Sequence, residues 1–264
     1  MPNDSRFAVL IDADNVSVRY IKIILDEISK DGIATYKRIY GDWTNPALVS
    51  WKSALLDNSV LPIQQYSYTT GKNSTDSAMI IDAMDILYSG QVEGFCLVSS
   101  DSDFTRLAAR LRESGMTVIG MGESKTPNSF ISACNKFKYL DILATAEDDE
   151  TEDVHKPQNA QQSKKTSKKS KEKPEQKKES SQELKTDLNT IRRALRTIVR
   201  ENSDEDDWIF IGKVGNILGK RYPDFDVRNY GFTKLTPFLD SLDMFYIKGE
   251  RKENSPPQYY VQLK

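Results

Sequence analysis

Short apolar runs alternate with amphipathic segments between Arg6 and Leu143. Runs such as FAVLI at 7–11 and FCLV at 95–98 end at Asp or Ser, a pattern typical of buried strands in a parallel sheet. After the first run, apolar residues at 21, 24, 25 and 28 recur at helical spacing. This alternation of strands and helices predicts an α/β domain with a parallel sheet covered by helices on both faces.

The same pattern gives bounds for the remaining elements of this domain. Further strands are expected at 33–40, 61–68, 94–99 and 116–121, with a last apolar segment at 137–143. The first helix is expected to end at Gly32, and the other helices are expected at 47–56, 75–88, 104–113 and 129–134.

The apolar pattern breaks off after residue 145. An acidic block, EDDETED at 147–153, is followed by a tract of Lys, Gln and Ser at 161–180. Because such a segment cannot bury enough apolar surface to fold, residues 146–182 are expected to form a disordered, charged linker. The chain is therefore divided into a first domain at 1–145, the linker, and a second domain at 183–264.

The second domain has a different pattern. An apolar stripe from Leu184 to Ile198 predicts an arginine-bearing helix, and two further helices are expected around Val214 and at 232–242. Two strands at 244–248 and 259–263 flank a polar loop. Helices followed by a β-hairpin predict a small α+β domain of the winged-helix type.

Composition adds mainly exclusions. The chain has 37 basic and 39 acidic side chains and a formal net charge of −2, so bulk charge does not indicate a nucleic-acid partner. Cys96 and Cys134 are too few for a metal knuckle or a disulfide framework. The single histidine, His155, lies in a polar tract, which argues against a histidine-based triad or a His-ligated zinc site. No apolar run is long enough for a membrane span, and a cytoplasmic protein is expected.

Carboxylates follow two of the predicted strands directly. Asp12 and Asp14 come after the first strand, and Asp101 and Asp103 come after the strand that ends near Ser99. The carboxyl ends of parallel strands share one edge of a sheet, where sites form in open α/β folds. Asp76 opens a helix that starts at the same edge. The alternative is that these acids only cap helices or place favourable negative charge at helix N-termini.

Four crowded carboxylates repel one another and raise each other's pKa unless a cation lies between them. Oxygen-only ligands suit Mg²⁺ or Mn²⁺, and such ions activate water and polarise a phosphoryl oxygen without a histidine base. The chemistry indicated is phosphodiester hydrolysis. The acids are Asp12, Asp76, Asp101 and Asp103, and the supporting polar residues are Asp14, Asn15, Ser99 and Ser102.

Residues 7–143 resemble the NYN domain, a branch of the PIN-like metal-dependent ribonucleases. The matching segments are FAVLIDADN (7–15), RIYGDW (38–43), GKNSTDSAMIIDAMDIL (71–87), LVSSDSDFTRLAARLRESGMTVIGMG (97–122) and ACNKFKYLD (133–141). The resemblance implies a three-layer α/β/α fold in which Asp12, Asp76, Asp101 and Asp103 form the catalytic metal site. Asp82 also matches the family pattern. It lies two turns further along its helix, about 9 Å from Asp76, and is interpreted as structural.

The segment from Trp208 to Leu263 resembles the LOTUS domain, also called OST-HTH. This resemblance implies binding of RNA, expected to be single-stranded, or docking of a protein partner. The candidate RNA contacts are Lys213, Lys220, Arg221, Arg228 and Lys234. Together the two resemblances predict a Mg²⁺- or Mn²⁺-dependent ribonuclease with a C-terminal RNA-binding domain. The alternatives are an RNA-binding adaptor with little turnover and a scaffold that docks a protein partner.

Overall fold

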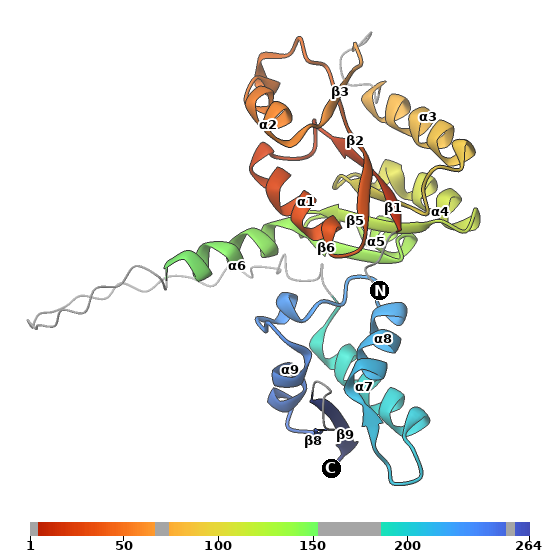
Figure 1. The fold of residues 1–264 in the computed structure, drawn as a ribbon, viewed down its shortest axis with the longest axis vertical. Helices are drawn as coiled ribbons and strands as arrows, with labels where there is room; N and C mark the ends of the chain where they lie inside the picture. Colours follow the sequence, from red (N-terminus) through yellow and green to blue (C-terminus); the bar gives the residue numbers. More distant parts are fainter. Residues whose placement is uncertain (1–4, 67–73, 153–185, 252–256) are drawn as a thin grey trace, which may run out of the picture.

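The computed structural model describes residues 5–66, 74–152, 186–251 and 257–264, which form two domains stacked along the long axis (Figure 1). The first domain is built on six parallel strands in the order β3-β2-β1-β4-β5-β6. Their bounds are β1 Arg6–Asp12, β2 Ile33–Gly41, β3 Leu61–Gln64, β4 Gly94–Val98, β5 Thr117–Gly122 and β6 Lys136–Tyr139. The predicted parallel sheet is confirmed.

Helices cover both faces of this sheet (Figure 1). One layer contains α1 Ile21–Ser29, α2 Trp51–Asn58 and α6 Leu140–Glu152, and the other contains α3 Ser74–Ser89, α4 Thr105–Glu113 and α5 Asn128–Ala133. Alternate residues of β1 separate the two cores, since Val9 and Ile11 pack in the first and Ala8 and Leu10 in the second. The three-layer α/β/α prediction is therefore confirmed. Short 3₁₀ turns are η1 Val18–Tyr20, η2 Pro46–Leu48 and η3 Ser102–Phe104.

The strand order reverses between β1 and β4. The chain moves outward on one side of β1 through β2 and β3, and on the other side through β4, β5 and β6. Helices that leave two neighbouring strands in opposite directions open a crevice at the carboxyl edge of the sheet. Asp12 is the last residue of β1, and Ser99 follows the end of β4. The polar residues of the predicted site therefore meet at this crevice.

The largest difference from the sequence prediction lies at the end of the first domain. The apolar segment at 137–143 is not one element, because it divides into β6 and the start of α6. Leu140 and Leu143 are both buried and belong to the core that α1 also lines. Helix α6 continues to Glu152, into residues predicted as linker. The rest of the predicted linker lies outside the described residues.

The second domain has the elements expected of a winged helix. Its bounds are α7 Leu188–Asn202, β7 Ile209–Phe210, α8 Ile211–Arg221, η4 Val227–Tyr230, α9 Leu235–Ser241, β8 Phe245–Glu250 and β9 Gln258–Leu263. The strands form an antiparallel sheet in the order β7-β9-β8. Helix α7 packs Ile191, Leu195 and Ile198 into the domain's core. In the described part of the chain, no helix has the length and hydropathy needed to cross a membrane.

The second domain docks on the first through a buried carboxylate. Glu27 of α1 is 3% exposed and accepts hydrogen bonds of 2.6 and 3.0 Å from the guanidinium of Arg228 in η4. Lys138 of β6 lies 3.1 Å from the same carboxylate. Burial alone would raise the pKa of Glu27, but the bonds from Arg228, Lys30 and Lys138 outweigh it and hold that pKa well below its usual range. Glu27 therefore stays charged between the two domains.

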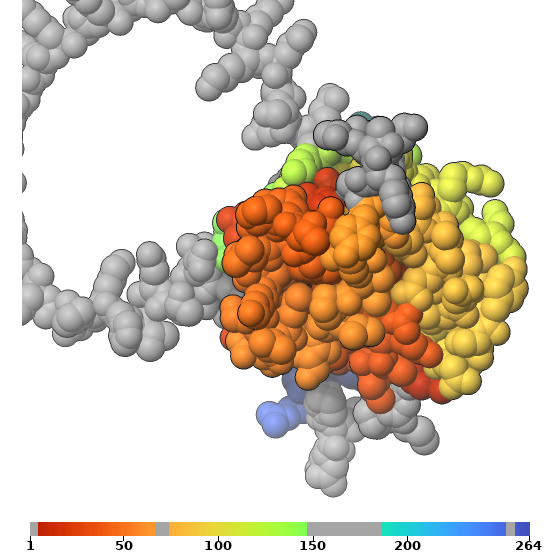
Figure 2. Space-filling view, turned by 90° about the horizontal axis from the view of Figure 1, so that it is seen from above, coloured from red at the N-terminus to blue at the C-terminus, as the bar shows by residue number. Residues whose placement is uncertain are grey.

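The second domain also covers the edge strand of the sheet. The backbone N–H of Phe137 in β6 donates to the carbonyl of Pro223 at 2.7 Å. The Tyr139 hydroxyl donates to Asp224 at 3.4 Å, and Asp224 also accepts from the Thr186 backbone N–H at 2.8 Å. An uncovered edge strand invites pairing with other chains. Seen from above, the first domain hides most of the blue second domain, which confirms the stacked arrangement (Figure 2).

Substitution of the interdomain carboxylate is expected to loosen the docking. Glu27→Gln leaves Arg228 and Lys138 without their shared buried anion, which should cost on the order of 3 kcal/mol. The free energy of unfolding from denaturant titration should fall, and the radius of gyration from solution scattering should rise.

Glu93→Gln provides a matched control. Glu93 pairs with Arg6 at the surface, where the two side chains are 50% and 43% exposed, so its loss should cost less than about 1 kcal/mol. Equal effects of the two substitutions would show that the Glu27 network does not hold the domains together.

Candidate metal centre

Asp12 lies at the base of the crevice and is fully buried. Its carboxylate accepts from the amide of Asn15 at 2.8 Å, from the hydroxyl of Ser99 at 2.8 Å and from the backbone N–H of Asp14 at 3.1 Å. Burial raises the pKa of Asp12, and these three donors partly offset the rise. The three donors, Asn15, Ser99 and Asp14, also fix the orientation of the Asp12 carboxylate.

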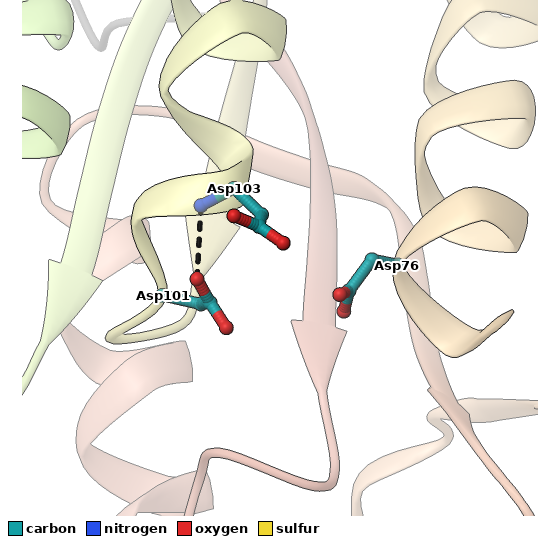
Figure 3. Close-up of side chains that lie close together, drawn as sticks. All are labelled: Asp76, Asp101 and Asp103. Atoms are coloured by element: carbon teal, nitrogen blue, oxygen red, sulfur yellow. Dashed lines mark hydrogen bonds between the residues drawn. The ribbon is translucent and has the colours of Figure 1, made fainter. Parts of the chain in front are cut away.

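Asp101 and Asp103 lie on the turn that leads from β4 into α4. Asp101 is the N-cap of η3, and one of its oxygens accepts from the Asp103 backbone N–H at 2.9 Å, drawn as the dashed line in Figure 3. Its own backbone N–H donates to the hydroxyl of Ser99 at 3.1 Å. Ser99 therefore connects Asp101 with Asp12. The capping role expected as the alternative is present, but it occupies only one oxygen of Asp101.

Asp76 approaches from the opposite side of the crevice. It lies in the first turn of α3 and is 8% exposed. Figure 3 shows its carboxylate directed toward Asp101 and Asp103 across the end of a strand. Burial and then the charges of Asp12, Asp101 and Asp103 raise the pKa of Asp76 to about 6. The crowding of negative charge expected from the sequence is thus a property of the folded site.

The three acids drawn in Figure 3 fit a divalent cation. One oxygen from each of Asp76, Asp101 and Asp103 lies within 4.8 Å of the others, and oxygens bound to the same Mg²⁺ or larger cation lie at most about 4–5 Å apart. All these donors are carboxylate oxygens, which favours a hard cation over zinc. Asp12 is not a member of this triplet. Asp12 is connected to the triplet in two ways. Ser99 hydrogen-bonds both Asp12 and the backbone of Asp101, and the charge of Asp12 raises the pKa of Asp76.

Two hydroxyl residues close in sequence to the acids are not among the residues predicted for the site. Within the described residues, Ser74 Oγ and Thr105 Oγ1 are buried without a hydrogen-bond partner. Ser74 precedes Asp76 by two positions in the first turn of α3, and Thr105 follows Asp103 by two positions at the start of α4. The only sequence feature that could have indicated them is the position of each hydroxyl residue two places from an acid of the predicted site. Ser102, predicted as supporting, is exposed at the start of η3.

Asp82 lies apart from the cluster, as its position on the helix suggested. Its carboxylate accepts from Arg38 and from the hydroxyl of Tyr40. Its side chain is therefore engaged by β2, which supports a structural role.

The candidate RNA contacts of the second domain occupy different environments. Lys220 and Arg221 are exposed at the C-terminal end of α8, whereas Lys213 near its start donates to the Asn202 carbonyl at 3.4 Å. Lys234 precedes α9 as its N-cap residue. Arg228 is held by Glu27 and by Asp226, the latter at 2.6 Å. Its environment favours an interdomain role over RNA contact, and the RNA-binding assignment of all five residues stays a prediction.

Two solved structures are similar to part of the chain. A crystal structure of a protein of unknown function from Vibrio parahaemolyticus is 17% identical with a TM-score of 0.45, covering 53% of this chain and 94% of that one. A solution structure of an uncharacterized protein from Nitrosomonas europaea is 27% identical with a TM-score of 0.26, covering 37% of this chain and 92% of that one. Neither supports a functional argument. No curated protein matches the chain.

Family models match both domains. The OST-HTH/LOTUS model matches residues 186–256 and indicates RNA binding. The NYN model matches residues 6–141 and indicates a nuclease of the PIN-like superfamily. This second match spans more than half of the chain and includes Asp12, Asp76, Asp101 and Asp103, so the chain belongs to the NYN-domain family and carries an OST-HTH/LOTUS domain in its C-terminal part.

Proposed function

We propose that this protein is a ribonuclease that hydrolyses RNA phosphodiester bonds with Mg²⁺ or Mn²⁺ bound by Asp76, Asp101 and Asp103. The observation that carries the proposal is the convergence of these carboxylates within 4.8 Å at the strand-order reversal. Single-stranded RNA as the substrate and a cytoplasmic location are part of the proposal.

The remaining residues support a metal-assisted hydrolysis. A bound divalent ion would supply charge stabilisation at the phosphoryl group and an activated water. Asp12 adds negative charge behind the triplet, and Asn15 and Ser99 hold its carboxylate in one orientation. Burial raises the pKa of Cys96 and of Cys134 to about 12, so neither cysteine offers a thiolate nucleophile near neutral pH.

The direct test incubates the full chain with end-labelled single-stranded RNA in Mg²⁺, Mn²⁺ or EDTA. Cleavage with either metal and none in EDTA is the expected result. RNA binding without cleavage in any metal would instead identify an RNA-binding adaptor. A protein that neither binds nor cleaves RNA would leave docking of a protein partner as the role of the second domain.

Removing one carboxylate of the triplet should abolish cleavage without unfolding the protein. Asp101→Asn relieves repulsion among the acids but takes away a metal ligand, so turnover should fall by more than the roughly 10–100-fold typical of an outer-shell partner. The control is Asp82→Asn, which loses its charge pair with Arg38 and should lower stability while retaining more activity. The measurements are single-turnover cleavage rates and thermal unfolding midpoints. The opposite ranking of activities would place Asp82 in the site.

The pH dependence of stability should report the crowded Asp76. Its pKa is about 6 in the folded protein, whereas an aspartate in an unfolded chain titrates near 3.8. The folded state therefore binds more protons between these values, and stability should fall as pH rises through that window. In EDTA, Asp76→Asn should stabilise the protein at pH 7.5 by up to about 3 kcal/mol and change little at pH 3.5.

With added Mn²⁺ at pH 7.5, the wild type should instead be more stable than Asp76→Asn. The ion stabilises the folded wild type by binding its three carboxylates, and the variant has lost one of them. Asp57→Asn, an exposed aspartate on α2, serves as the control and should behave as wild type at both pH values. Stabilisation by Asp76→Asn that is equal at pH 3.5 and 7.5 would contradict the assignment of the charge penalty to this site.

A further inference from the structure

A basic groove runs between the two domains, away from the acidic site. It has a volume of about 640 Å³ and is lined by residues of both domains. The charged residues that line it are Arg112, Lys136, Lys138, Lys220, Arg221 and Asp226. Five of these six are cations, although the chain as a whole has a formal net charge of −2. Positive charge is therefore concentrated at the domain junction.

Part of this charge is compensated inside the protein. Lys136 and Lys138 lie 2.5 and 2.7 Å from Asp31, and Asp226 is held by Arg228. In the described part of the chain, Lys220 and Arg221 form no ion pair. Both are exposed at the end of α8, next to the open space beside Gly219. Surplus positive charge on the groove is thus supplied mainly by the second domain.

The first domain contributes a fixed cation. Arg112, in the last turn of α4, donates to the carbonyl oxygens of Ser132 and Ala133 at 3.2 Å each. These carbonyls orient the guanidinium without neutralising it. A second cavity of about 540 Å³ shares Arg112 and Asn135 with the groove and extends past Gly115 and Thr117. Because they share two lining residues, the two cavities lie next to each other on the surface.

We infer that this interdomain groove binds the sugar–phosphate backbone of an RNA strand. The inference rests on the proposed function, in which RNA is the substrate. An extended polyanion fits cations that are spread over two domains and along adjacent cavities, because each phosphate can contact its own lysine or arginine. The groove lies at the far end of α4 from Asp101 and Asp103, a helix length of about 13 Å. Exposed Arg106 and Arg110 lie on α4 between them.

The test measures RNA binding by the full chain in EDTA, so that no turnover is required. Fluorescence anisotropy with a labelled single-stranded RNA is recorded over a series of salt concentrations. Lys220→Gln/Arg221→Gln removes two groove cations and should weaken binding, with the slope of log K against log salt reduced by about 1.4. Arg112→Gln, in the other domain, should reduce the slope by about 0.7.

Charge-matched controls separate the groove from a general electrostatic effect. Arg193→Gln/Arg196→Gln removes two exposed cations from α7 in the same domain, and Lys52→Gln removes one from α2 in the first domain. Both controls should keep the wild-type slope. Thermal unfolding midpoints confirm that each variant is folded, and if Arg112→Gln unfolds, the Lys220→Gln/Arg221→Gln variant alone decides.

The outcomes distinguish the groove from the proposed activity. RNA binding that is unchanged in the groove variants, or weakened equally in the α7 control, overturns the groove and leaves the ribonuclease proposal intact. Groove-dependent binding by a wild-type protein that never cleaves RNA supports the groove and overturns the proposed activity.

Discussion

Electrostatic repulsion at the end of two neighbouring strands is the constraint on which this structure depends. The reversal of strand order between β1 and β4 brings Asp12 beside the turn that carries Asp101 and Asp103, and α3 adds Asp76 from the other side. The apolar cores on both faces of the sheet hold these strands in place, so the fold itself forces the carboxylates together. A buried Asp12 and a pKa near 6 for Asp76 are the consequence. A divalent cation would relieve this repulsion, so the cost of assembling the acids would contribute to the affinity for a bound metal.

A second arrangement of charge governs how the domains are joined. Glu27 is buried like Asp12, yet its surroundings differ, because the basic side chains of Lys30, Lys138 and Arg228 lie against its carboxylate. The same molecule therefore contains a carboxylate cluster in which neighbouring acids raise the pKa of Asp76 and a buried carboxylate, Glu27, whose pKa is lowered by basic neighbours. The first is suited to binding an ion from solution. The second joins two domains that are separated along the chain by a long polar segment.

The sequence was sufficient for the sheet and the acids but not for the docking. The runs at 7–11 and 95–98 are apolar throughout because a central strand of a parallel sheet is buried on both faces. An acid that directly follows such a run must lie at the carboxyl edge of the sheet. The division of 137–143 into β6 and α6 was missed, since a continuous apolar run does not reveal where a strand ends and a helix begins. The ion pair between Arg228 and Glu27 could not be predicted, because the two residues lie 201 positions apart in the sequence. No local pattern marks a solvent-facing side chain that another domain will cover.

The docking also changes what the second domain contributes. The second domain packs against β6 and α1, at the edge strand and toward the amino ends of the strands. The acids lie at the carboxyl ends, so the described residues of the second domain do not contribute to the acidic cluster. It places its cations at a fixed separation from that cluster, with α4 extending from Asp103 at one end to Arg112 at the other. In the proposed function, RNA would bind at one edge of the sheet and be hydrolysed at the other, and the length of α4 would set the distance between the two sites.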